Sequence, residues 1–226
     1  MNRDVQARWN KSNLAMPSQR THSAYAEIVE GLLPKASTIC ELGAGSGTDT
    51  LYFLDHGHSV IAVDISDKAL GLLSENAKKK HLDKNLTMVQ ADLGDHALPF
   101  EDNSLDIVYS RLSLQYFPRE VTTLILKEIK RILRPGGVGF IAVKSPEDAK
   151  EMQFFRQTAR EESQGVFIDN GQIKSRFSIK DWETMLQNAR ISQFTVRSFT
   201  EDMSNKIDEV KSGNSKFLLT EIKIVK

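Results

Sequence analysis

The stretch CELGAGSGTDT, residues 40–50, sets three glycines within five residues directly after the strand-like sequence STICEL. Glycine adopts backbone angles that other residues avoid, and it lets the chain approach a ligand closely. A glycine-rich turn between a strand and a helix is typical of loops that bind nucleotide-like ligands. The stretch therefore predicts a strand, a ligand-binding loop and a helix, in that order.

Strands and helices alternate along the chain on both sides of this loop. A helix over residues 20–33 precedes the loop and ends at Pro34, and apolar strand sequences then alternate with amphipathic helices. The expected strands are 37–42, 59–63, 86–92, 104–110 and 138–144, and the expected helices are 47–56, 67–80 and 119–133. All-apolar strands separated by helices predict a parallel sheet covered on both faces, which right-handed crossovers make doubly wound.

The two ends of the chain and one internal segment depart from this rhythm. Residues 1–20 are polar and are expected to form an N-terminal arm or cap on a domain spanning residues 21–226. Residues 145–178 interrupt the alternation and predict an insertion or lid. A helix at 178–189 and two strands at 191–199 and 216–225 complete the chain, with the strands expected as an antiparallel pair at one edge.

The composition limits the partners. The 226 residues include 30 basic and 30 acidic side chains, so there is no basic excess and we expect no nucleic-acid partner. The single cysteine, Cys40, forms no internal disulfide and is expected in the core. No signal peptide or membrane span is recognisable, which predicts a cytoplasmic protein without a membrane partner. The oligomeric state stays open.

The glycine spacing differs from a dinucleotide fingerprint. That fingerprint is G-x-G-x-x-G, but here Gly43 and Gly45 are followed by Thr48 where the third glycine belongs, and Gly47 comes one residue early. Asp64 ends the second strand, where a carboxylate can accept both hydroxyls of a ribose. Asp92 ends the third strand, where its carboxylate can accept an adenine amino group beside the N–H of Leu93.

Five motifs in order resemble the class I S-adenosylmethionine-dependent methyltransferases, especially those that act on small molecules. They are ELGAGSG (41–47), VDIS (63–66), ADLGDHALPF (91–100), DIVYSRLSLQYF (106–117) and LKEIKRILRPGGVGFIAV (126–143). The resemblance implies an α/β fold with a doubly wound, mostly parallel seven-stranded Rossmann-like sheet and an antiparallel C-terminal edge strand. It also implies S-adenosyl-L-methionine as cofactor.

The resemblance assigns the glycine loop to the cofactor. Gly43, Ala44, Gly45 and Gly47 would let the backbone approach the cofactor, and Glu41 would contribute near its amino acid portion.

Further cofactor contacts are implied at the ends of the next three strands. Asp64 would bind the ribose, with Ile65 packing on the adenine. Asp92 and Leu93 would read the adenine edge, and Ser110 would lie near the methionine moiety.

The acceptor side is less defined. Gln115 and Tyr116 follow the fourth strand at the sheet edge where ligands bind, which makes them candidates for the acceptor pocket. Many relatives carry a histidine in this segment, whereas Gln115 stands here, and His56 and His58 are expected to be exposed to solvent. No catalytic residue and no metal site are assigned. A sulfonium methyl is already activated, so in-line alignment supplies much of the catalysis.

Three functions remain open at this stage. The leading hypothesis is an S-adenosylmethionine-dependent methyltransferase of a small-molecule acceptor. The rivals are an NAD(P)-binding oxidoreductase, disfavoured by Thr48 and Asp92, and a non-catalytic S-adenosylmethionine-binding regulatory protein. The sequence does not identify the acceptor or the atom methylated.

Overall fold

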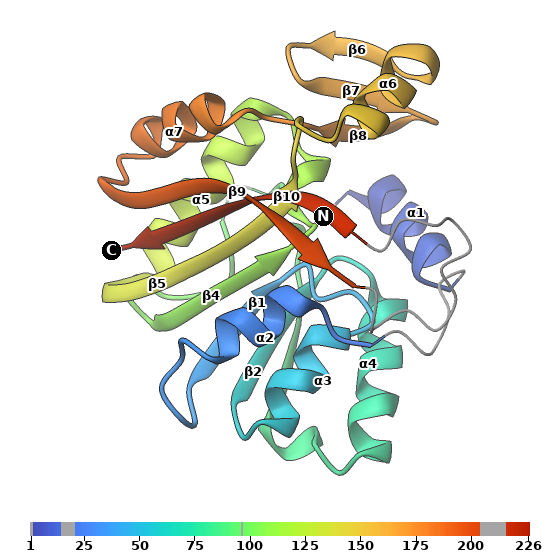
Figure 1. The fold of residues 1–226 in the computed structure, drawn as a ribbon. Helices are drawn as coiled ribbons and strands as arrows, with labels where there is room; N and C mark the ends of the chain where they lie inside the picture. Colours follow the sequence, from blue (N-terminus) through green and yellow to red (C-terminus); the bar gives the residue numbers. More distant parts are fainter. Residues whose placement is uncertain (1, 15–20, 96, 204–215) are drawn as a thin grey trace.

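The computed structural model describes residues 2–14, 21–95, 97–203 and 216–226. Its centre is a seven-stranded sheet in the order β3-β2-β1-β4-β5-β10-β9, and the first five strands of this order are parallel (Figure 1). The strands are β1 (Thr38–Leu42), β2 (Ser59–Asp64), β3 (Leu86–Gln90), β4 (Leu105–Arg111), β5 (Leu133–Lys144), β9 (Gln193–Asp202) and β10 (Lys216–Val225). The predicted α/β fold with a mostly parallel seven-stranded sheet is therefore confirmed.

Helices cover both faces of the sheet. One face packs against α2 (Ala24–Glu30), α3 (Thr48–Asp55) and α4 (Asp67–Lys79), and the other against α5 (Arg119–Ile132) and α7 (Ile179–Asn188). Successive side chains of a strand point to opposite faces, so β1 serves both cores. Ile39 lies in the apolar cluster of α2 and α3, whereas Cys40 and Leu42 lie in that of α5 and α7.

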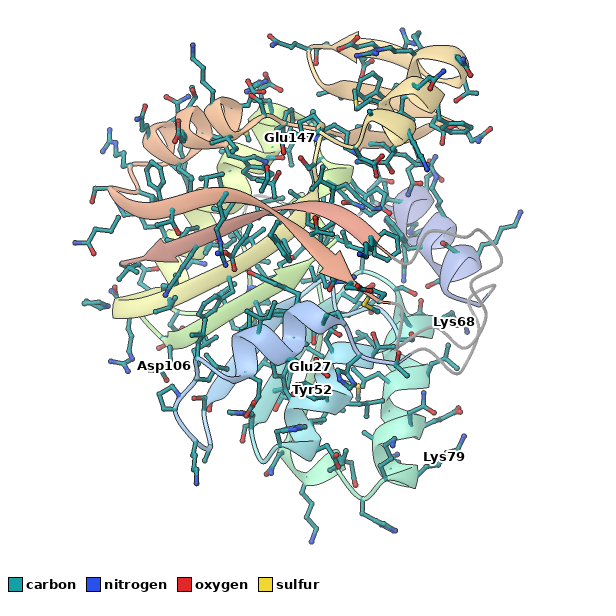
Figure 2. The ribbon with its side chains drawn as sticks, viewed as in Figure 1. Glu27, Tyr52, Lys68, Lys79, Asp106 and Glu147 are labelled. Atoms are coloured by element: carbon teal, nitrogen blue, oxygen red, sulfur yellow. The ribbon has the colours of Figure 1, made fainter. Side chains whose placement is uncertain are left out.

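The helices are amphipathic, as their sequence periodicity predicts. In α4, Ser66 caps the N-terminus by accepting a hydrogen bond from the Ala69 N–H, and Leu70 and Leu73 are buried. Lys68 and Lys79 project from the opposite face of this helix into solvent (Figure 2). Within the described ranges, no helix has the length and apolar composition that a bilayer-spanning helix needs.

The C-terminal strands form the antiparallel pair that the sequence predicts at one edge of the sheet, and the structure adds the order of the two strands. β10 pairs antiparallel with both β5 and β9, so the antiparallel strand lies one place inside the edge, and β9 occupies the edge itself. Burial explains this order. Leu219, Ile222 and Ile224 of β10 are fully buried, whereas most of β9 is partly or fully exposed. The more apolar strand takes the interior place because both of its faces are covered.

Residues 145–178, which the sequence marks as an insertion, fold into a helix and a small antiparallel sheet. The elements are α6 (Ala149–Thr158), β6 (Arg160–Ser163), β7 (Val166–Asp169) and β8 (Gln172–Ser175). Phe155 and Phe167 are buried and stacked with their ring centroids 5.2 Å apart, so they form a small core of this segment. The Ser175 hydroxyl donates to the Phe117 carbonyl at 2.6 Å, which joins the segment to the turn η2 (Leu114–Tyr116).

Two local expectations are wrong. Strand β5 begins at Leu133, so the Pro-Gly-Gly sequence at 135–137 is a bulge within the strand, between the pairs Leu105–Leu133 and Ile107–Val138. His58 is buried, because its Nδ1 accepts a hydrogen bond from the Ser37 N–H at 3.1 Å and thereby joins the starts of β1 and β2.

A buried polar network connects α2, α3 and β4. The carboxylate of Asp49 in α3 accepts hydrogen bonds from the backbone N–H of Ser23 at 2.7 Å, the Ser23 hydroxyl at 2.8 Å and the Tyr109 hydroxyl at 2.7 Å. All three residues are buried. A buried carboxylate is stable only when its oxygens are satisfied, so this network fixes the start of α2 against the sheet.

The glycine loop is shaped by two close contacts. A Cβ on Gly43 would lie 2.1 Å from the Ser113 Oγ and 2.5 Å from the Ser113 Cβ, and a Cβ on Gly47 would lie 2.3 Å from a methyl carbon of Leu73. Both glycines also have positive φ angles, of 78° and 83°. Only glycine fits where the chain is left-handed and a neighbour fills the Cβ position. The loop therefore lets the turn after β4 and helix α4 approach β1.

We expect Tyr109→Phe to destabilise the protein by about 1.5–3 kcal/mol, because the buried Asp49 carboxylate loses a charge-assisted hydrogen bond. Urea unfolding followed by circular dichroism measures this change. The control is Tyr52→Phe, which removes a hydroxyl from a partly exposed ring outside the network. Equal free energies of unfolding for the two variants would contradict the structural role of this network.

We expect Gly43→Ala to be more destabilising than Gly57→Ala. Both positions have a positive φ, but a Cβ on Gly57 meets nothing within 4 Å. Gly57→Ala therefore carries only the backbone strain of about 1–2 kcal/mol, and the Ser113 clash adds about 1–3 kcal/mol to Gly43→Ala. The double variant Gly43→Ala/Ser113→Gly removes the clash and should return to the stability of Gly57→Ala. A double variant no more stable than Gly43→Ala would disprove the clash.

Candidate cofactor site

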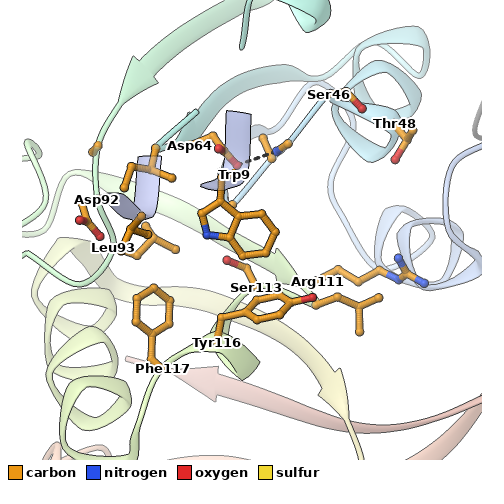
Figure 3. A pocket seen from close by; sticks show the side chains of 17 residues that line it. Trp9, Ser46, Thr48, Asp64, Asp92, Leu93, Arg111, Ser113, Tyr116 and Phe117 are labelled. Atoms are coloured by element: carbon orange, nitrogen blue, oxygen red, sulfur yellow. Dashed lines mark hydrogen bonds between the residues drawn. The ribbon is translucent and has the colours of Figure 1, made fainter. Parts of the chain in front are cut away.

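A cavity of about 250 Å³ lies at the carboxyl ends of β1, β2, β3 and β4 (Figure 3). Parallel strands bring their carboxyl ends to one edge of the sheet, and open α/β sheets bind ligands there. The residues that line the cavity are Val5, Trp9, Gly43, Ala44, Gly45, Ser46, Thr48, Asp64, Ile65, Ala91, Asp92, Leu93, Arg111, Leu112, Ser113, Tyr116 and Phe117. Of the twelve site residues expected from sequence, eight are in this set.

Asp64 joins β2 to the glycine loop. One carboxylate oxygen accepts the N–H of Gly45 and the other accepts the N–H of Ser66, both at 2.8 Å. Burial raises the pKa of Asp64, and the backbone hydrogen bonds from Ser66, Gly45 and Ile65 oppose this effect. The side chain is mostly buried but still reaches the cavity, so it presents a carboxylate to a ligand in a fixed orientation.

Asp92 and Leu93 form one end of the cavity. The Asp92 carboxylate accepts the N–H of Gly94 at 3.0 Å and the N–H of Asn2 at 3.2 Å. In Figure 3, Asp92 and Leu93 lie at one end of the cavity and Arg111 lies at the other end. Asp64 lies between these two ends. The two acids thus follow one another along the sheet edge, as β3 and β2 do.

Four expected site residues do not line the cavity. Gly47 packs on Leu73, and the Ser110 hydroxyl donates to the Leu42 carbonyl at 2.8 Å. The Gln115 amide oxygen accepts the N–H of Lys144 at 3.0 Å. The fourth residue, Glu41, lies behind the glycine loop. All four residues therefore contact the segments that form the cavity wall and do not face the cavity.

Glu41 is buried between β1 and α3. Its carboxyl group accepts a hydrogen bond from the Thr50 hydroxyl. Burial raises the pKa of Glu41 well above its ordinary value, and the nearby negative charge of Asp49 raises it further, while the Thr50 hydrogen bond lowers it. The physical effect of this environment is to favour a neutral side chain beneath the loop.

Sequence reasoning missed the cavity residues at the end of β4 and in the turn after it. Arg111, Leu112 and Ser113 are consecutive, yet all three line the cavity. In a regular strand Arg111 and Ser113 would share one face and Leu112 would point to the other. The φ of 56° at Leu112 departs from strand geometry, so the three side chains do not follow that alternation. The motif DIVYSRLSLQYF located this segment, but nothing in it signals a left-handed leucine.

Helix α1 (Arg3–Leu14) covers part of the cavity. Asn10 and Gln6 both donate to Asp67, at 2.9 and 3.0 Å, and the Ser66 hydroxyl donates to the Asn10 amide oxygen at 2.6 Å. The Trp9 ring packs edge-on against the Tyr116 ring with centroids 4.7 Å apart. The described part of the N-terminal arm therefore forms a wall of the site, whereas residues 15–20 lie outside the described ranges.

Few titratable side chains line the cavity. Within the described chain they are Asp64, Asp92, Arg111 and Tyr116, and the described histidines lie elsewhere. His96 is not among the described residues. No group of three metal-ligating side chains is found in the described ranges. The arrangement is that of a site that binds and orients a ligand.

The glycine loop and the following strands match a known protein family. Residues 39–137 match the family described as "Methyltransferase domain". This segment runs from β1 to the start of β5 and includes the glycine loop, Asp64, Asp92 and the turn after β4.

Curated relatives match over the same region. Phosphoethanolamine N-methyltransferase 1 of Triticum aestivum is 36% identical over 115 residues, which are 50% of this chain and 23% of that protein. Cypemycin N-terminal methyltransferase of a Streptomyces species is 32% identical over 113 residues, which are 49% of this chain and 43% of that protein. The matches span less than half the length of these relatives.

Solved structures share the fold over nearly the whole chain. An S-adenosylmethionine-dependent methyltransferase from Methanosarcina mazei has a TM-score of 0.69 at 22% identity, covering 88% of this chain and 96% of the other. A 1,6-didemethyltoxoflavin-N1-methyltransferase from Burkholderia thailandensis, with S-adenosylhomocysteine bound, has a TM-score of 0.69 at 17% identity, covering 99% and 86%.

The family match, the shared fold and the order of the acids and the glycine loop along the sheet edge all favour the methyltransferase hypothesis. These findings decide against the hypothesis of an NAD(P)-binding oxidoreductase. Residues 39–137 therefore form a methyltransferase domain by sequence, and the chain has the fold of solved S-adenosylmethionine-dependent methyltransferases.

Proposed function

We propose that this protein transfers the methyl group of S-adenosylmethionine to a small-molecule acceptor by in-line displacement. The observation that carries the proposal is the order of polar groups along the sheet edge. Asp92 follows β3, Asp64 ends β2 and the glycine loop follows β1, and all three border one cavity. This order matches the order of adenine, ribose and methionine in the cofactor.

The proposed roles follow from this order. Asp92 and the Leu93 N–H meet the adenine edge, Ile65 packs on the adenine ring, and Asp64 accepts the ribose hydroxyls. Gly43, Ala44 and Gly45 allow the backbone to approach the ligand. Glu41, Gly47 and Ser110 lie behind the lining, so we assign them the indirect role of supporting the loop and β4.

The acceptor side is built from different elements. Tyr116 and Trp9 form an aromatic wall, and Ser113 is seen beside both rings (Figure 3). The Ser113 side chain also lies against Gly43 of the glycine loop. A small concave cavity with aromatic walls suits a small organic acceptor better than a flat macromolecular surface. Gln115 contributes indirectly, since its amide fixes η2 to β5 through the Lys144 N–H. We also propose that the segment at 145–178 shapes the acceptor entrance, because Ser175 bonds to Phe117 in the lining.

The chemistry requires little from the side chains. The acceptor's lone pair attacks the methyl carbon, the carbon–sulfur bond breaks, and its electrons return to sulfur, which leaves as a neutral thioether. The protein aligns the two reactants, and alignment can lower the barrier by roughly 7–11 kcal/mol.

The first test measures binding of S-adenosylhomocysteine by calorimetry. We expect the unmodified protein to bind it and Asp64→Ala to bind about 10- to 100-fold more weakly, since the hydrogen bonds of a charged group are lost. Asp106→Ala is the control, because Asp106 pairs with Arg134 at the far end of β4 and does not line the cavity. Failure of the unmodified protein to bind would overturn the proposal.

The second test follows the methyl group. Protein and labelled S-adenosylmethionine are incubated with cell extract, and the label is measured in the small-molecule, protein and nucleic-acid fractions. We expect labelled small molecules with the unmodified protein and none with Asp64→Ala. Label confined to macromolecules would reject the acceptor class, and binding without any transfer would favour the regulatory protein.

We further expect the affinity for S-adenosylhomocysteine to rise with pH. Ribose hydroxyls that donate to Asp64 favour its ionised form, so the pKa of Asp64 is lower in the complex than in the free protein, and binding releases a proton. Burial raises the pKa of free Asp64 above its ordinary value, so the loss of affinity begins at a higher pH than for an exposed aspartate. Binding titrations between pH 8 and pH 5 should show this loss of affinity in the unmodified protein. Asp64→Asn should bind S-adenosylhomocysteine weakly, with an affinity that does not change over this pH range. The same slope in both proteins would contradict the role of Asp64.

A further inference from the structure

The roles proposed for the cavity residues leave one charged side chain, that of Arg111, without a function. Arg111, at the end of β4, is the single basic side chain among the described lining residues. In Figure 3 it lies at the opposite end of the cavity from Asp92, with Asp64 between them. The strand order β3-β2-β1-β4 separates the ends of β3 and β4 by three strand spacings, or about 14 Å.

The guanidinium of Arg111 is fixed by a buried partner. Its Nε donates to Glu201 Oε1 at 3.1 Å, and its Nη2 donates to Glu201 Oε2. The Glu201 side chain is fully buried, and its Oε1 also accepts the N–H of Tyr25 at 3.0 Å. A planar guanidinium held along one edge has a defined orientation for its remaining donors.

One end of that guanidinium has donors to spare. Nη1 makes no hydrogen bond with the described residues, the side chain keeps 17% of its surface exposed, and Arg111 is one of the residues that line the cavity. The left-handed backbone of Leu112, whose N–H donates to the Ala142 carbonyl at 2.7 Å, holds this turn in place. Arg111 thus holds its guanidinium in a fixed orientation at the cavity wall.

The acidic side chains near Arg111 already accept hydrogen bonds from other residues. Asp49 accepts three hydrogen bonds from Ser23 and Tyr109, and Glu201 is bonded to Arg111 and Tyr25. The environment of Glu41 favours its neutral form. An incoming anion at Arg111 finds free donors at Nη1, and the negative charges of Glu201 and Asp49 also act on this guanidinium. The two other charged side chains of the lining, Asp64 and Asp92, are acids that repel an anion.

We propose that Arg111 binds the α-carboxylate of the methionine part of the cofactor. With the adenine at Asp92 and the ribose at Asp64, the extended ligand runs along the sheet edge past the glycine loop to the end of β4. The carboxylate is the only anionic group of the cofactor, and Arg111 is the cation at that end. The inference rests on the proposed function, and it makes Arg111 and Glu201 a unit that recognises the intact amino acid portion of the ligand.

The test compares two ligands that differ in this portion. S-adenosylhomocysteine carries the carboxylate, whereas 5′-methylthioadenosine keeps the adenosine and sulfur and lacks the amino acid. Dissociation constants for both are measured by calorimetry with the unmodified protein, Arg111→Gln and Arg197→Gln. Arg197 is the matched control, because it also pairs with a buried glutamate, Glu221, but does not line the cavity.

We expect Arg111→Gln to weaken S-adenosylhomocysteine binding about 10- to 100-fold, as expected for loss of a charge-assisted hydrogen bond, and to leave 5′-methylthioadenosine binding within about twofold. Arg197→Gln should bind both ligands as the unmodified protein does. Arg111→Lys should recover part of the preference for S-adenosylhomocysteine, because it restores the charge without the paired geometry.

Three outcomes would overturn the inference. An unchanged ratio of the two affinities in Arg111→Gln would mean that another group, such as the N-terminal amides of α3, binds the carboxylate. An equal loss for both ligands would mean that Arg111 acts only on the fold. If the unmodified protein binds neither ligand, the proposed function itself fails, and this result is distinct from the other two.

Discussion

The contact between Gly43 and Ser113 is the constraint on which the rest of the site depends. The loop after β1 and the turn after β4 approach so closely that a single added carbon on Gly43 would overlap the Ser113 side chain. This approach brings the ends of β1 and β4 to one cavity and sets Arg111 opposite Asp92. Two glycines of the loop therefore have a steric reason as well as a conformational one: Gly43 admits Ser113, and Gly47 admits Leu73 of α4.

Buried acids beneath the cavity maintain this approach. Asp49 joins Ser23 of the α2 cap to Tyr109 of β4, and Glu201 joins Tyr25 of α2 to Arg111. Each carboxylate sits in a region of low polarity and is stable only because its hydrogen bonds are satisfied. The start of α2 is thus tied to β4 on the same side of the sheet as the cavity wall. The residues that we propose to recognise the cofactor therefore also contribute to the packing of α2 against the sheet.

Much of this molecule could be predicted from its sequence. The alternation of apolar strands and amphipathic helices predicts the parallel sheet, and strand-end positions predict that Asp64 and Asp92 meet at one edge, where both border the cavity. The same reasoning fails for residues whose side-chain direction is set by the surroundings. Ser110 turns to the Leu42 carbonyl and Gln115 to the Lys144 N–H, whereas Arg111 and Ser113, on either side of the left-handed Leu112, border the cavity. His58, expected at the surface, is buried because its ring nitrogen satisfies the Ser37 N–H.

The sequence by itself determined the fold class, the glycine loop and the two acids at successive strand ends, because these follow from local periodicity and from the geometry common to all parallel sheets. Tertiary structure alone decided the order of β9 and β10, the closure of the cavity by α1 with Trp9, and the pairing of Arg111 with Glu201, 90 residues later in the chain. Those features arise from competition for burial and for hydrogen-bond partners between segments far apart in sequence. Such competition is settled only when the whole chain is packed.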